Sequence, residues 1–369
     1  MARLRLLPFV FALLGFGVSF SQNLECEQSL TQATAEFEAG RFYAIANILK
    51  PCIEKGFSKE QRVRAYLLLT QAYLVLDDPI AAEDSYLKLL KADPEYIANP
   101  AHDPIDVYYL SKKFTTTPIF TPHFNAGANV SFPRVIQSVS TNAAPDAIDK
   151  VLKIGYKVGG ALDWNVTSRW SVSLGVDYSF KSFKSNYSNQ FGNDTKTFTA
   201  KQDWIDIPII IKYSIDSGKV RPFAYAGLAA NLLVGSKLSL SSVDVSGPTQ
   251  VPSTGPDEPV TFKFNEFNRS VLVGGGVKIK QGINFFYIDV RYMAGLTNVV
   301  NPGRNYYDAN GNFDPVLTKY TYVMDLFRLD NLSISVGFVK PIYDPRKKEK
   351  AVTGLLQKIG IRKTRTIKK

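Results

Sequence analysis

Residues 152–165 read LKIGYKVGGALDWN, and residues 170–181 read WSVSLGVDYSFK. Apolar residues or glycine occupy every second position of both stretches, and the positions between them are charged, polar or small. Successive side chains of a β-strand point to opposite faces, so this period of two predicts strands with one apolar and one polar face. A soluble sandwich would bury the apolar face in a core, whereas a membrane barrel turns it to lipid and encloses the polar face.

The number and spacing of such segments favour the membrane barrel. The alternation runs from Phe114 to Tyr343 and predicts eight strands, at about 118–132, 152–165, 169–185, 201–215, 220–237, 261–280, 284–296 and 320–342. Their connections are alternately short (165–169, 216–219, 281–282) and long (133–151, 186–200, 238–260, 297–319), and the long ones are rich in Ser, Asn, Gly and Pro. Short periplasmic turns, long outer loops and an even strand count are typical of outer-membrane barrels with both ends in the periplasm.

Two finer features follow from the strand pattern. Alternation is less clean in 220–234, which predicts a β-bulge there. Aromatic residues near the short turns are expected to form a girdle at the membrane surface; they are Trp164, Trp170, Tyr213, Phe223, Tyr287 and Tyr343.

Charged residues recur at positions that face the interior of the predicted barrel: Lys153, Lys157, Asp163, Asp177, Lys181, Asp206, Lys212, Lys278, Lys280, Asp289 and Arg291. An eight-stranded barrel is just wide enough inside for its own side chains. We therefore expect these groups to form a lumen charge network of buried ion pairs, and we do not expect bulk diffusion through it. A proton or substrate relay would also need such charges, but no ordered pathway follows from the sequence.

The N-terminus has the layout of a signal peptide over residues 1–21. Arg3 and Arg5 precede the apolar stretch Leu6–Phe20, and small residues flank Phe20, so the mature chain is expected to begin at Gln22. Export implies an oxidising compartment.

The two cysteines of the mature chain are Cys26 and Cys52. They lie 14 residues before and 12 residues after Gly40, at the turn of a predicted hairpin of helices 25–39 and 42–53. A rise of about 1.5 Å per residue brings them to similar heights, which predicts a disulfide rather than two buried thiols.

Residues 65–94 show apolar and small residues at helical spacing in two halves around Asp77 and Asp78. The segment resembles a tetratricopeptide repeat, with Thr70 where the pattern prefers Gly. The cysteine hairpin looks like a degenerate first copy, so residues 22–114 are expected to form a periplasmic helical-repeat domain. Few repeats leave a face to be covered by a partner, and the predicted docking surface is Tyr66, Tyr73 and Tyr86; alternatively, these aromatics join a small helical core.

The net charge of +11 is concentrated at the chain ends. The last 24 residues hold ten Lys or Arg and one Glu, and Arg3 and Arg5 account for the rest, so the body of the chain is neutral. A neutral body argues against nucleic-acid binding. The basic periplasmic tail, residues 344–369, is expected either to bind a membrane surface or an acidic partner or to be a solvated end.

The middle of the chain, roughly residues 115–343, resembles the porin-like, OmpA-type outer-membrane β-barrel domain family of Gram-negative bacteria. The resemblance lies in Trp204–Tyr213 (WIDIPIIIKY), Arg221–Gly227 (RPFAYAG), Gly274–Val277 (GGGV), Ile288–Tyr292 (IDVRY) and Leu332–Phe338 (LSISVGF). It implies an all-β, up-and-down transmembrane barrel of eight antiparallel strands, here preceded by a small all-α domain. It says little about function, because the family is defined by its barrel.

The sequence does not favour an enzyme. Its two histidines, His102 and His123, are both expected on the periplasmic side, away from an outer-rim site. Oxygen ligands alternate in 308–314 as in a calcium loop, but Gly311 stands at the fourth position and Lys319 where a bidentate Glu is needed, so we interpret the segment as a turn. We expect no cofactor and no metal.

These features predict a non-enzymatic outer-membrane barrel that anchors a periplasmic protein-docking module, as part of or accessory to an envelope assembly such as secretion or motility machinery. Its expected partners are outer-membrane lipid and periplasmic or outer-membrane proteins, bound through the helical module and the basic tail. The alternative is a narrow channel or small-ligand uptake porin, which would need a continuous wet lumen.

Overall fold

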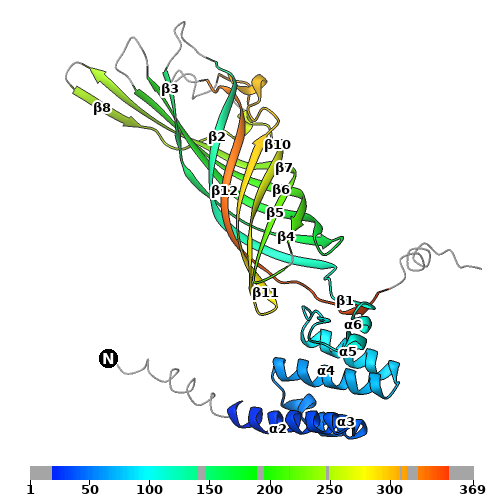
Figure 1. Cartoon of the computed structure of the whole chain (residues 1–369). Helices are drawn as coiled ribbons and strands as arrows, with labels where there is room; N and C mark the ends of the chain where they lie inside the picture. Colours follow the sequence, from blue (N-terminus) through cyan, green and yellow to red (C-terminus); the bar gives the residue numbers. More distant parts are fainter. Residues whose placement is uncertain are drawn as a thin grey trace, which may run out of the picture. The chain divides into compact units, whose positions relative to one another are not determined.

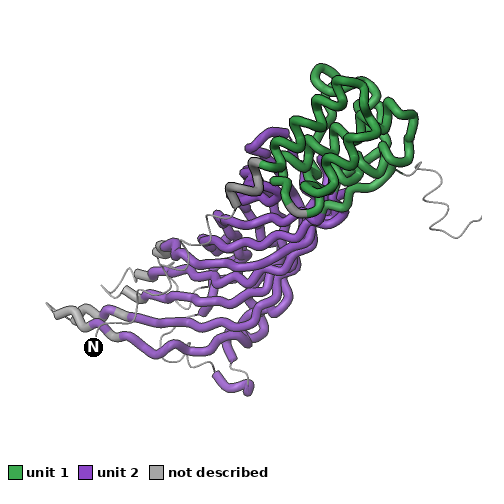
Figure 2. The backbone as a smooth tube through the Cα atoms, turned by 90° about the horizontal axis from the view of Figure 1, so that it is seen from below, with its two compact units in different colours: residues 1–117, 343–369 green, residues 118–342 purple. Residues whose placement is uncertain are grey.

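A computed structural model describes residues 19–139, 147–188, 195–215, 217–246, 249–307, 310–313 and 323–348. The chain divides into two compact units: 1–117 together with 343–369, and 118–342 (Figure 2). Most of the expected signal peptide and most of the basic tail lie outside the described residues.

The first unit contains α-helices (Figure 1), namely α2 (Ser19–Glu38), α3 (Phe42–Lys55), α4 (Lys59–Val75), α5 (Pro79–Ala92) and α6 (Ile105–Ser111). Their boundaries follow from local chemistry. Gly40 takes a positive φ of 77° in the turn between α2 and α3. Ser58 and Gln61 form a capping box at the start of α4, and the Asp78 side chain accepts a hydrogen bond from the Ala81 amide at the start of α5.

The helices enclose two apolar clusters. The first joins α2, α3 and α4 around Leu30, Ile45 and Leu49 and includes the Cys26–Cys52 disulfide, whose Cα atoms are 5.6 Å apart. The presence of this bond confirms the disulfide prediction. The second cluster joins α5 and α6 around Leu89 and Val107.

The segment that follows the barrel belongs to the helical unit. Strand β13 (Arg346–Lys347) pairs with β1 (Phe114–Thr115), and the Lys348 amide donates to the Lys113 carbonyl at 2.7 Å. Two side-chain contacts add to this pairing: Lys347 Nζ lies 2.6 Å from Glu83, and the Tyr343 hydroxyl donates to Glu95 at 2.8 Å. We call residues 343–348 the strap. The sequence pattern did not predict it.

The second unit is built from antiparallel strands, namely β2 (Phe120–Gln137), β3 (Ala147–Leu152), β4 (Ile154–Asn165), β5 (Trp170–Ser188), β6 (Thr195–Ser214), β7 (Val220–Ser246), β8 (Thr249–Thr254), β9 (Glu258–Pro259), β10 (Phe267–Gln281), β11 (Asn284–Gly295) and β12 (Leu326–Val339). Within the described residues, the pairing runs β10–β11–β12–β2–β4–β5–β6–β7 and returns from β7 to β10, which closes a barrel-like ring (Figure 1). Strand β3 pairs with β5, and β8 and β9 pair with β7.

Several expected loops are strand instead. Strands β5, β6 and β7 run well into 186–200 and 238–260, because their backbones keep pairing where hydrophobic alternation is weak: Asn186 pairs with Thr197, and Thr197 with Ser241. Conversely, residues 261–263 form a 3-10 helix, so the strand expected from 261 begins only at Phe267. The bulge predicted in 220–234 is confirmed at Val234, since Asp203 pairs with Gly235 and Trp204 with Leu233.

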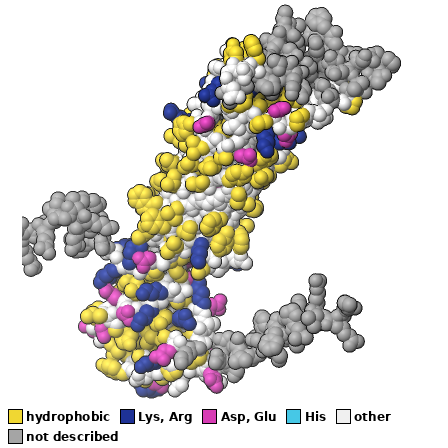
Figure 3. Space-filling model, turned by 180° about the vertical axis from the view of Figure 1, so that it is seen from behind, with side chains coloured by type: hydrophobic (Ala, Val, Ile, Leu, Met, Phe, Trp, Pro, Cys, Tyr) yellow, Lys and Arg dark blue, Asp and Glu magenta, His cyan; other side chains and the backbone are white. Residues whose placement is uncertain are grey.

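The outer face of the ring is apolar. Figure 3 shows hydrophobic side chains gathered over the strands, and those with more than half of their surface exposed include Phe124, Val158, Trp164, Leu174, Ile209, Ile211, Leu228, Val273 and Val336. Such an exterior fits strands that face lipid. None of the described helices is long and apolar enough to cross a membrane.

The expected aromatic girdle is only partly outside. Trp164 and Trp170 are half exposed at the turn between β4 and β5, but Phe223 and Tyr287 are 8% and 7% exposed and face the interior. The girdle prediction was wrong for these two, because they occupy the same strand face as the buried residues Tyr225 and Asp289.

Candidate functional site

The barrel interior holds a set of buried ion pairs. Lys212 on β6 reaches Asp163 on β4 at 2.7 Å, and Lys181 on β5 reaches Asp206 on β6 at 3.0 Å. All four residues are no more than 6% exposed. Buried charges of this kind are tolerated only when paired and hydrogen-bonded.

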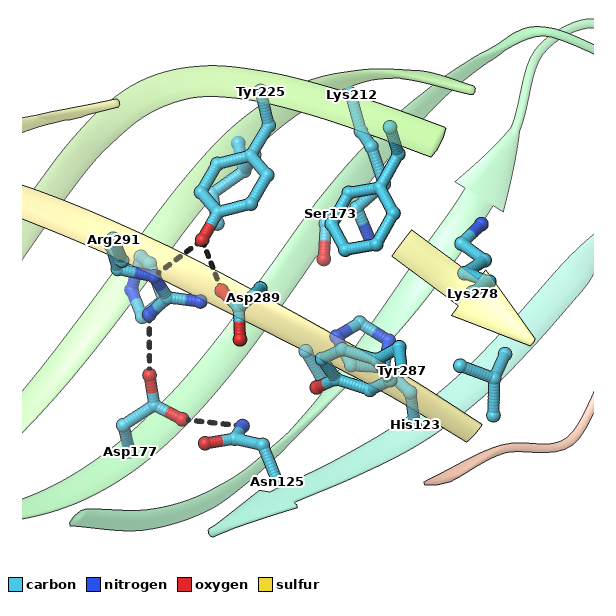
Figure 4. Close-up of a pocket in the computed structure, with 15 residues that line it drawn as sticks. His123, Asn125, Ser173, Asp177, Lys212, Tyr225, Lys278, Tyr287, Asp289 and Arg291 are labelled. Carbon is cyan, nitrogen blue, oxygen red and sulfur yellow. Dashed lines mark hydrogen bonds and ion pairs between the residues drawn. The ribbon is translucent and has the colours of Figure 1, made fainter. Parts of the chain in front are cut away.

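One ion pair crosses the whole lumen. Arg291 on β11 lies 2.8 Å from Asp177 on β5. Three strands separate β11 from β5 on either side of the ring: β12, β2 and β4 on one side, and β10, β7 and β6 on the other. The two side chains therefore meet from opposite walls, and Asn125 on β2 adds a hydrogen bond to Asp177 at 3.0 Å (Figure 4).

A further carboxylate, Asp289 on β11, accepts a hydrogen bond from the Tyr225 hydroxyl on β7. The same hydroxyl is 3.2 Å from Arg291 Nε, so Tyr225 links this carboxylate to the crossing pair (Figure 4). These contacts tie β2, β5, β7 and β11 together through the middle of the barrel.

Apolar side chains fill another part of the interior. Phe183, Trp204, Leu233, Phe327 and Leu329 are all less than 9% exposed and form one cluster with residues of 260–264 and 299–300. Rings of this cluster pack edge to face, with Phe183 and Phe327 centroids 5.4 Å apart. The cluster lies toward the strand ends far from the short turns and fills the ring there.

The sequence contained a signal for this cluster that the analysis missed. Phe183 stands two residues after the lumen-facing Lys181, and Trp204 stands two residues before Asp206. Large apolar residues on the polar face of a strand indicate a packed interior rather than a wet one.

A small cavity remains beside the crossing pair (Figure 4). His123, Asn125, Tyr287 and Asp289 are among its lining residues, and its volume is about 20 Å³. A space of this size holds about one water molecule. It is too small for a nutrient or a drug-sized ligand, which occupies several hundred Å³.

Most members of the predicted charge network face this interior. Lys157, Asp163, Asp177, Asp206, Lys212, Asp289 and Arg291 are buried, and Lys278, which donates to the Ser214 hydroxyl at 3.2 Å, is partly buried. The expectation was wrong for Lys153. This residue is exposed in the break between β3 and β4, where the side chain is released from the inward alternation.

The predicted docking surface is contradicted at Tyr86. Tyr86 is 2% exposed in the second helical cluster, and burial raises its pKa to about 12. Tyr66 and Tyr73 are partly buried and pack against both helical clusters. Tyr86 therefore joins the helical core, which is the alternative given above, and Tyr66 and Tyr73 pack at the edge of that core.

No group of three or more His, Cys, Asp or Glu suited to a metal ion occurs among the described residues. Asp308 and Asp314 of the calcium-like segment lie outside them.

Comparison with known families agrees with this architecture. Residues 118–301 match the family model described as outer membrane protein beta-barrel domain. The chain is an outer-membrane β-barrel protein. Its barrel is accordingly placed in the outer membrane. No curated protein matches the chain.

Solved structures that are similar to this outer-membrane protein share little sequence with it. Neisserial surface protein A is 12% identical, with a TM-score of 0.30 over 62% of this chain and 97% of its own. OprG from Pseudomonas aeruginosa is 9% identical, with a TM-score of 0.35 over 63% and 99%. The attachment invasion locus protein Ail of Yersinia pestis is 12% identical, with a TM-score of 0.25 over 60% and 98%.

Proposed function

We propose that this protein is a non-enzymatic anchor: the barrel holds the helical unit at the periplasmic face of the outer membrane, where that unit and the basic tail bind a partner protein of an envelope assembly. The observation that carries the proposal is the filled interior. Ion pairs span the lumen, and an apolar cluster fills its far part. In this proposal a barrel with a closed interior anchors the helical unit and does not conduct solutes.

The strand connectivity supports a periplasmic position for both chain ends. In this proposal the ring has eight strands. Strand β3 pairs only with the end of β5, and β8 and β9 pair only with β7, so these three strands are not part of the ring. His123 near the start of β2 pairs with Val339 at the end of β12, so the chain enters and leaves the ring at one end. The tight connection after Gln281 lies at that same end, because Phe285 also pairs with Val339. Short turns are periplasmic in this class of barrel.

The strap supports a dedicated attachment of the helical unit. Because β13 pairs with β1, the segments before and after the barrel are joined to each other within one unit. A helical unit on a single flexible linker would need no such return.

The partner surface in this proposal is a set of exposed apolar side chains of the helical unit rather than Tyr66, Tyr73 and Tyr86. Tyr43, Ile80 and Ile97 are each more than 80% exposed, and Ile105 and Tyr109 on α6 are more than half exposed. Side chains of this kind are available to a protein partner. The tetratricopeptide-like spacing of α4 and α5 agrees with a protein-binding role.

The experiment that tests the anchor is affinity purification of the tagged protein from solubilised outer membranes. We expect a periplasmic partner to be recovered with the full chain and lost on deletion of 26–114, while the barrel still inserts. Deletion of 349–369 spares the strap and should weaken recovery in a salt-dependent way, because solvated charges are screened within about 8 Å at physiological salt. Recovery of the same partner with the barrel alone would refute the docking role.

A narrow channel or small-ligand uptake barrel is the second candidate, and the cavity beside Arg291 is the observation in its favour. It requires steady single-channel conductance by the purified protein in planar bilayers. The anchor proposal predicts no such conductance, so this measurement distinguishes the two functions.

A further inference from the structure

The exterior of the ring carries three arginines at the strand ends that lie far from the short turns. Arg134 on β2 pairs directly with Arg328 on β12. A third arginine, Arg269 on β10, is exposed on the other side of β11. We call Arg134, Arg328 and Arg269 the arginine row.

All three side chains of the arginine row lie on the outer face of the ring. Arg328 stands six residues before Ile334 on β12, and Arg269 stands four residues before Val273 on β10. Ile334 and Val273 are more than half exposed, and residues an even number apart on a strand share a face. Arg134 shares this face, because residues directly opposite on antiparallel strands point the same way, and its side chain is 51% exposed.

Backbone contacts place the arginine row on four neighbouring strands. The Leu296 amide, next to the end of β11, donates to the Arg269 carbonyl at 2.9 Å. On the other side of β11, the Gly295 amide donates to the Asp330 carboxylate of β12 at 2.9 Å. Neighbouring strands lie about 4.8 Å apart, so Arg269 and Arg328, two strands apart, are separated by about 10 Å across the sheet.

A carboxylate and a carbonyl hold Arg134 in place. Its Nε and Nη2 donate to Asp330 at 3.0 and 3.1 Å, and Nη2 also donates to the Gly295 carbonyl at 3.0 Å. The Tyr292 hydroxyl adds a bond to the same carboxylate at 3.1 Å. The Arg134 guanidinium therefore has a fixed position beside Arg328.

Asp330 balances the charge of the arginine row only in part. Among the described residues, no carboxylate forms an ion pair with Arg328 or with Arg269, whose guanidinium lies 5.5 Å over the Phe267 ring. Like charges directly opposite each other on paired strands are destabilising. An anion bound beside Arg134 and Arg328 would remove this repulsion.

The arginine row lies just beyond the apolar belt of the barrel. On β2 and β4 this belt runs from Phe120, paired with Trp164, to Val130, paired with Ile154. A strand crosses the hydrocarbon of a membrane in about 9–11 residues, which is the length from Phe120 to Val130. Arg134 stands four residues further along β2, about 10 Å at the usual strand tilt, and so at the level of the polar headgroups.

We propose that the arginine row binds a phosphate group of a phosphorylated glycolipid in the outer leaflet. Arg328 and Arg269 donate hydrogen bonds to the phosphate, since a guanidinium presents paired N–H groups that match phosphate oxygens. Arg134, held by Asp330, adds positive charge beside them. A lipid is favoured over a soluble anion because the apolar belt next to the row accommodates acyl chains.

The inference rests on the orientation in the proposed function, in which these strand ends face outward, and not on the partner of the helical unit. Its test is a lipid-binding measurement on the purified full-length protein. Partner recovery is measured separately, so failure of the lipid site and failure of the anchor are distinguishable.

The first test uses the natural chain in a nonionic detergent. The protein is titrated with lipid A that carries both phosphates, with lipid A from which the phosphates have been removed, and with phosphatidylglycerol, and bound lipid is counted by native mass spectrometry. We expect the doubly phosphorylated form to bind at least about tenfold more tightly than the other two, because charge-assisted hydrogen bonds of this kind are worth that factor. Equal binding of the dephosphorylated form would refute phosphate recognition, and equal binding of phosphatidylglycerol would overturn the assignment to a glycolipid.

The second test assigns the binding to the arginine row. The double variant Arg269→Gln/Arg328→Gln removes two guanidinium groups and leaves the Arg134–Asp330 pair in place. We expect it to bind doubly phosphorylated lipid A at least about tenfold more weakly. Arg304→Gln is the matched control, because Arg304 is an exposed arginine in the 3-10 helix Pro302–Arg304, outside the row, and its loss should leave the affinity unchanged. Unchanged affinity in the double variant, or an equal loss in Arg304→Gln, would show that the row is not the binding site.

Discussion

Arg291 on β11 and Asp177 on β5 meet at 2.8 Å from opposite walls of the barrel. A contact between such strands is possible only because the lumen is as narrow as two side chains. The pair thus acts as a strut across the ring, and Asn125 and Tyr225 hold its two ends. It is the single relationship that most distinguishes a closed barrel from an open pore.

Removing one end of this strut should destabilise the barrel. Arg291→Met leaves the Asp177 carboxylate buried without its cation, which costs about 3–5 kcal/mol for pairs of this kind. The measurement is the free energy of unfolding in urea, in detergent micelles or lipid. The companion change Asp177→Leu in the same chain should restore much of the loss, and Lys153→Met, at an exposed position, should stay within about 0.5 kcal/mol. If Arg291→Met is as stable as the natural chain, the Arg291–Asp177 pair does not contribute to the free energy of unfolding.

Gly159 should be intolerant of a side chain. A Cβ there would lie 2.0 Å from Asp177 Oδ1 and 2.6 Å from the Val176 carbonyl oxygen, so Gly159→Ala displaces the Asp177 carboxylate from Asn125. Overpacking of this kind costs about 1–3 kcal/mol. Gly235→Ala is the matched control, because its Cβ would meet no atom closer than 3.7 Å. Equal unfolding midpoints for the two variants would contradict the crowding seen at Gly159.

The disulfide should stabilise the helical unit alone. Closing the 26-residue separation between Cys26 and Cys52 is worth about 3 kcal/mol in the chain-entropy model. Reduction should therefore lower the melting temperature of helical circular dichroism while the β signal of the barrel is unchanged. Protein prepared without reductant should contain no alkylatable thiol after denaturation. Two free thiols per chain, or a barrel that melts with the helices on reduction, would be the contrary result.

The sequence predicted those strand segments that have one apolar and one polar face. It did not predict the segments that are polar on both faces. Leu152–Asn165 alternates between lipid-facing and lumen-facing residues, so its period was readable. Near the start of β6 and the end of β7, Thr197 pairs with Ser241. Both residues are polar, so this part of the strands shows no alternation of apolar and polar residues. The strands there depend on backbone pairing, which composition does not record.

The candidate site shows the same division. Strand phase placed Asp163, Asp177 and Arg291 in the lumen because each belongs to an alternating run. It could not reveal that Arg291 meets Asp177, since partners across a ring depend on register and closure. It also failed for Tyr86, because helical spacing places a residue on a face without telling which neighbour covers that face.

The proposed topology predicts which parts of the chain a protease reaches on intact cells. Asn310 lies in the connection between β11 and β12, the end opposite the short turns, and should be cut by external protease after introduction of a cleavage site. A tag after Lys369 should stay protected until the outer membrane is opened. Labelling of that tag on intact cells would reverse the orientation.

Acid should weaken the attachment of the strap, because it protonates Glu83. Hydrogen bonding from Lys347, assisted by Lys113, lowers the pKa of the Glu83 carboxyl below its ordinary value of 4.5. A lowered pKa in the folded state means that the pair stabilises the strap above pH 4.5 and loses this contribution as the pH falls through the lowered value. Because Lys347 is 59% exposed, the contribution should not exceed about 1 kcal/mol and should weaken with salt.

Hydrogen exchange of the Lys348 amide, which donates to the Lys113 carbonyl, reports on opening of the strap. Its protection, corrected for the intrinsic pH dependence of exchange, should fall on acidification in the natural chain and should be lower and flat in Glu83→Gln. Glu60→Gln, on a helix elsewhere in the unit, is the control that should behave as the natural chain does, and an unaltered pH profile in Glu83→Gln would exclude Glu83 as the cause.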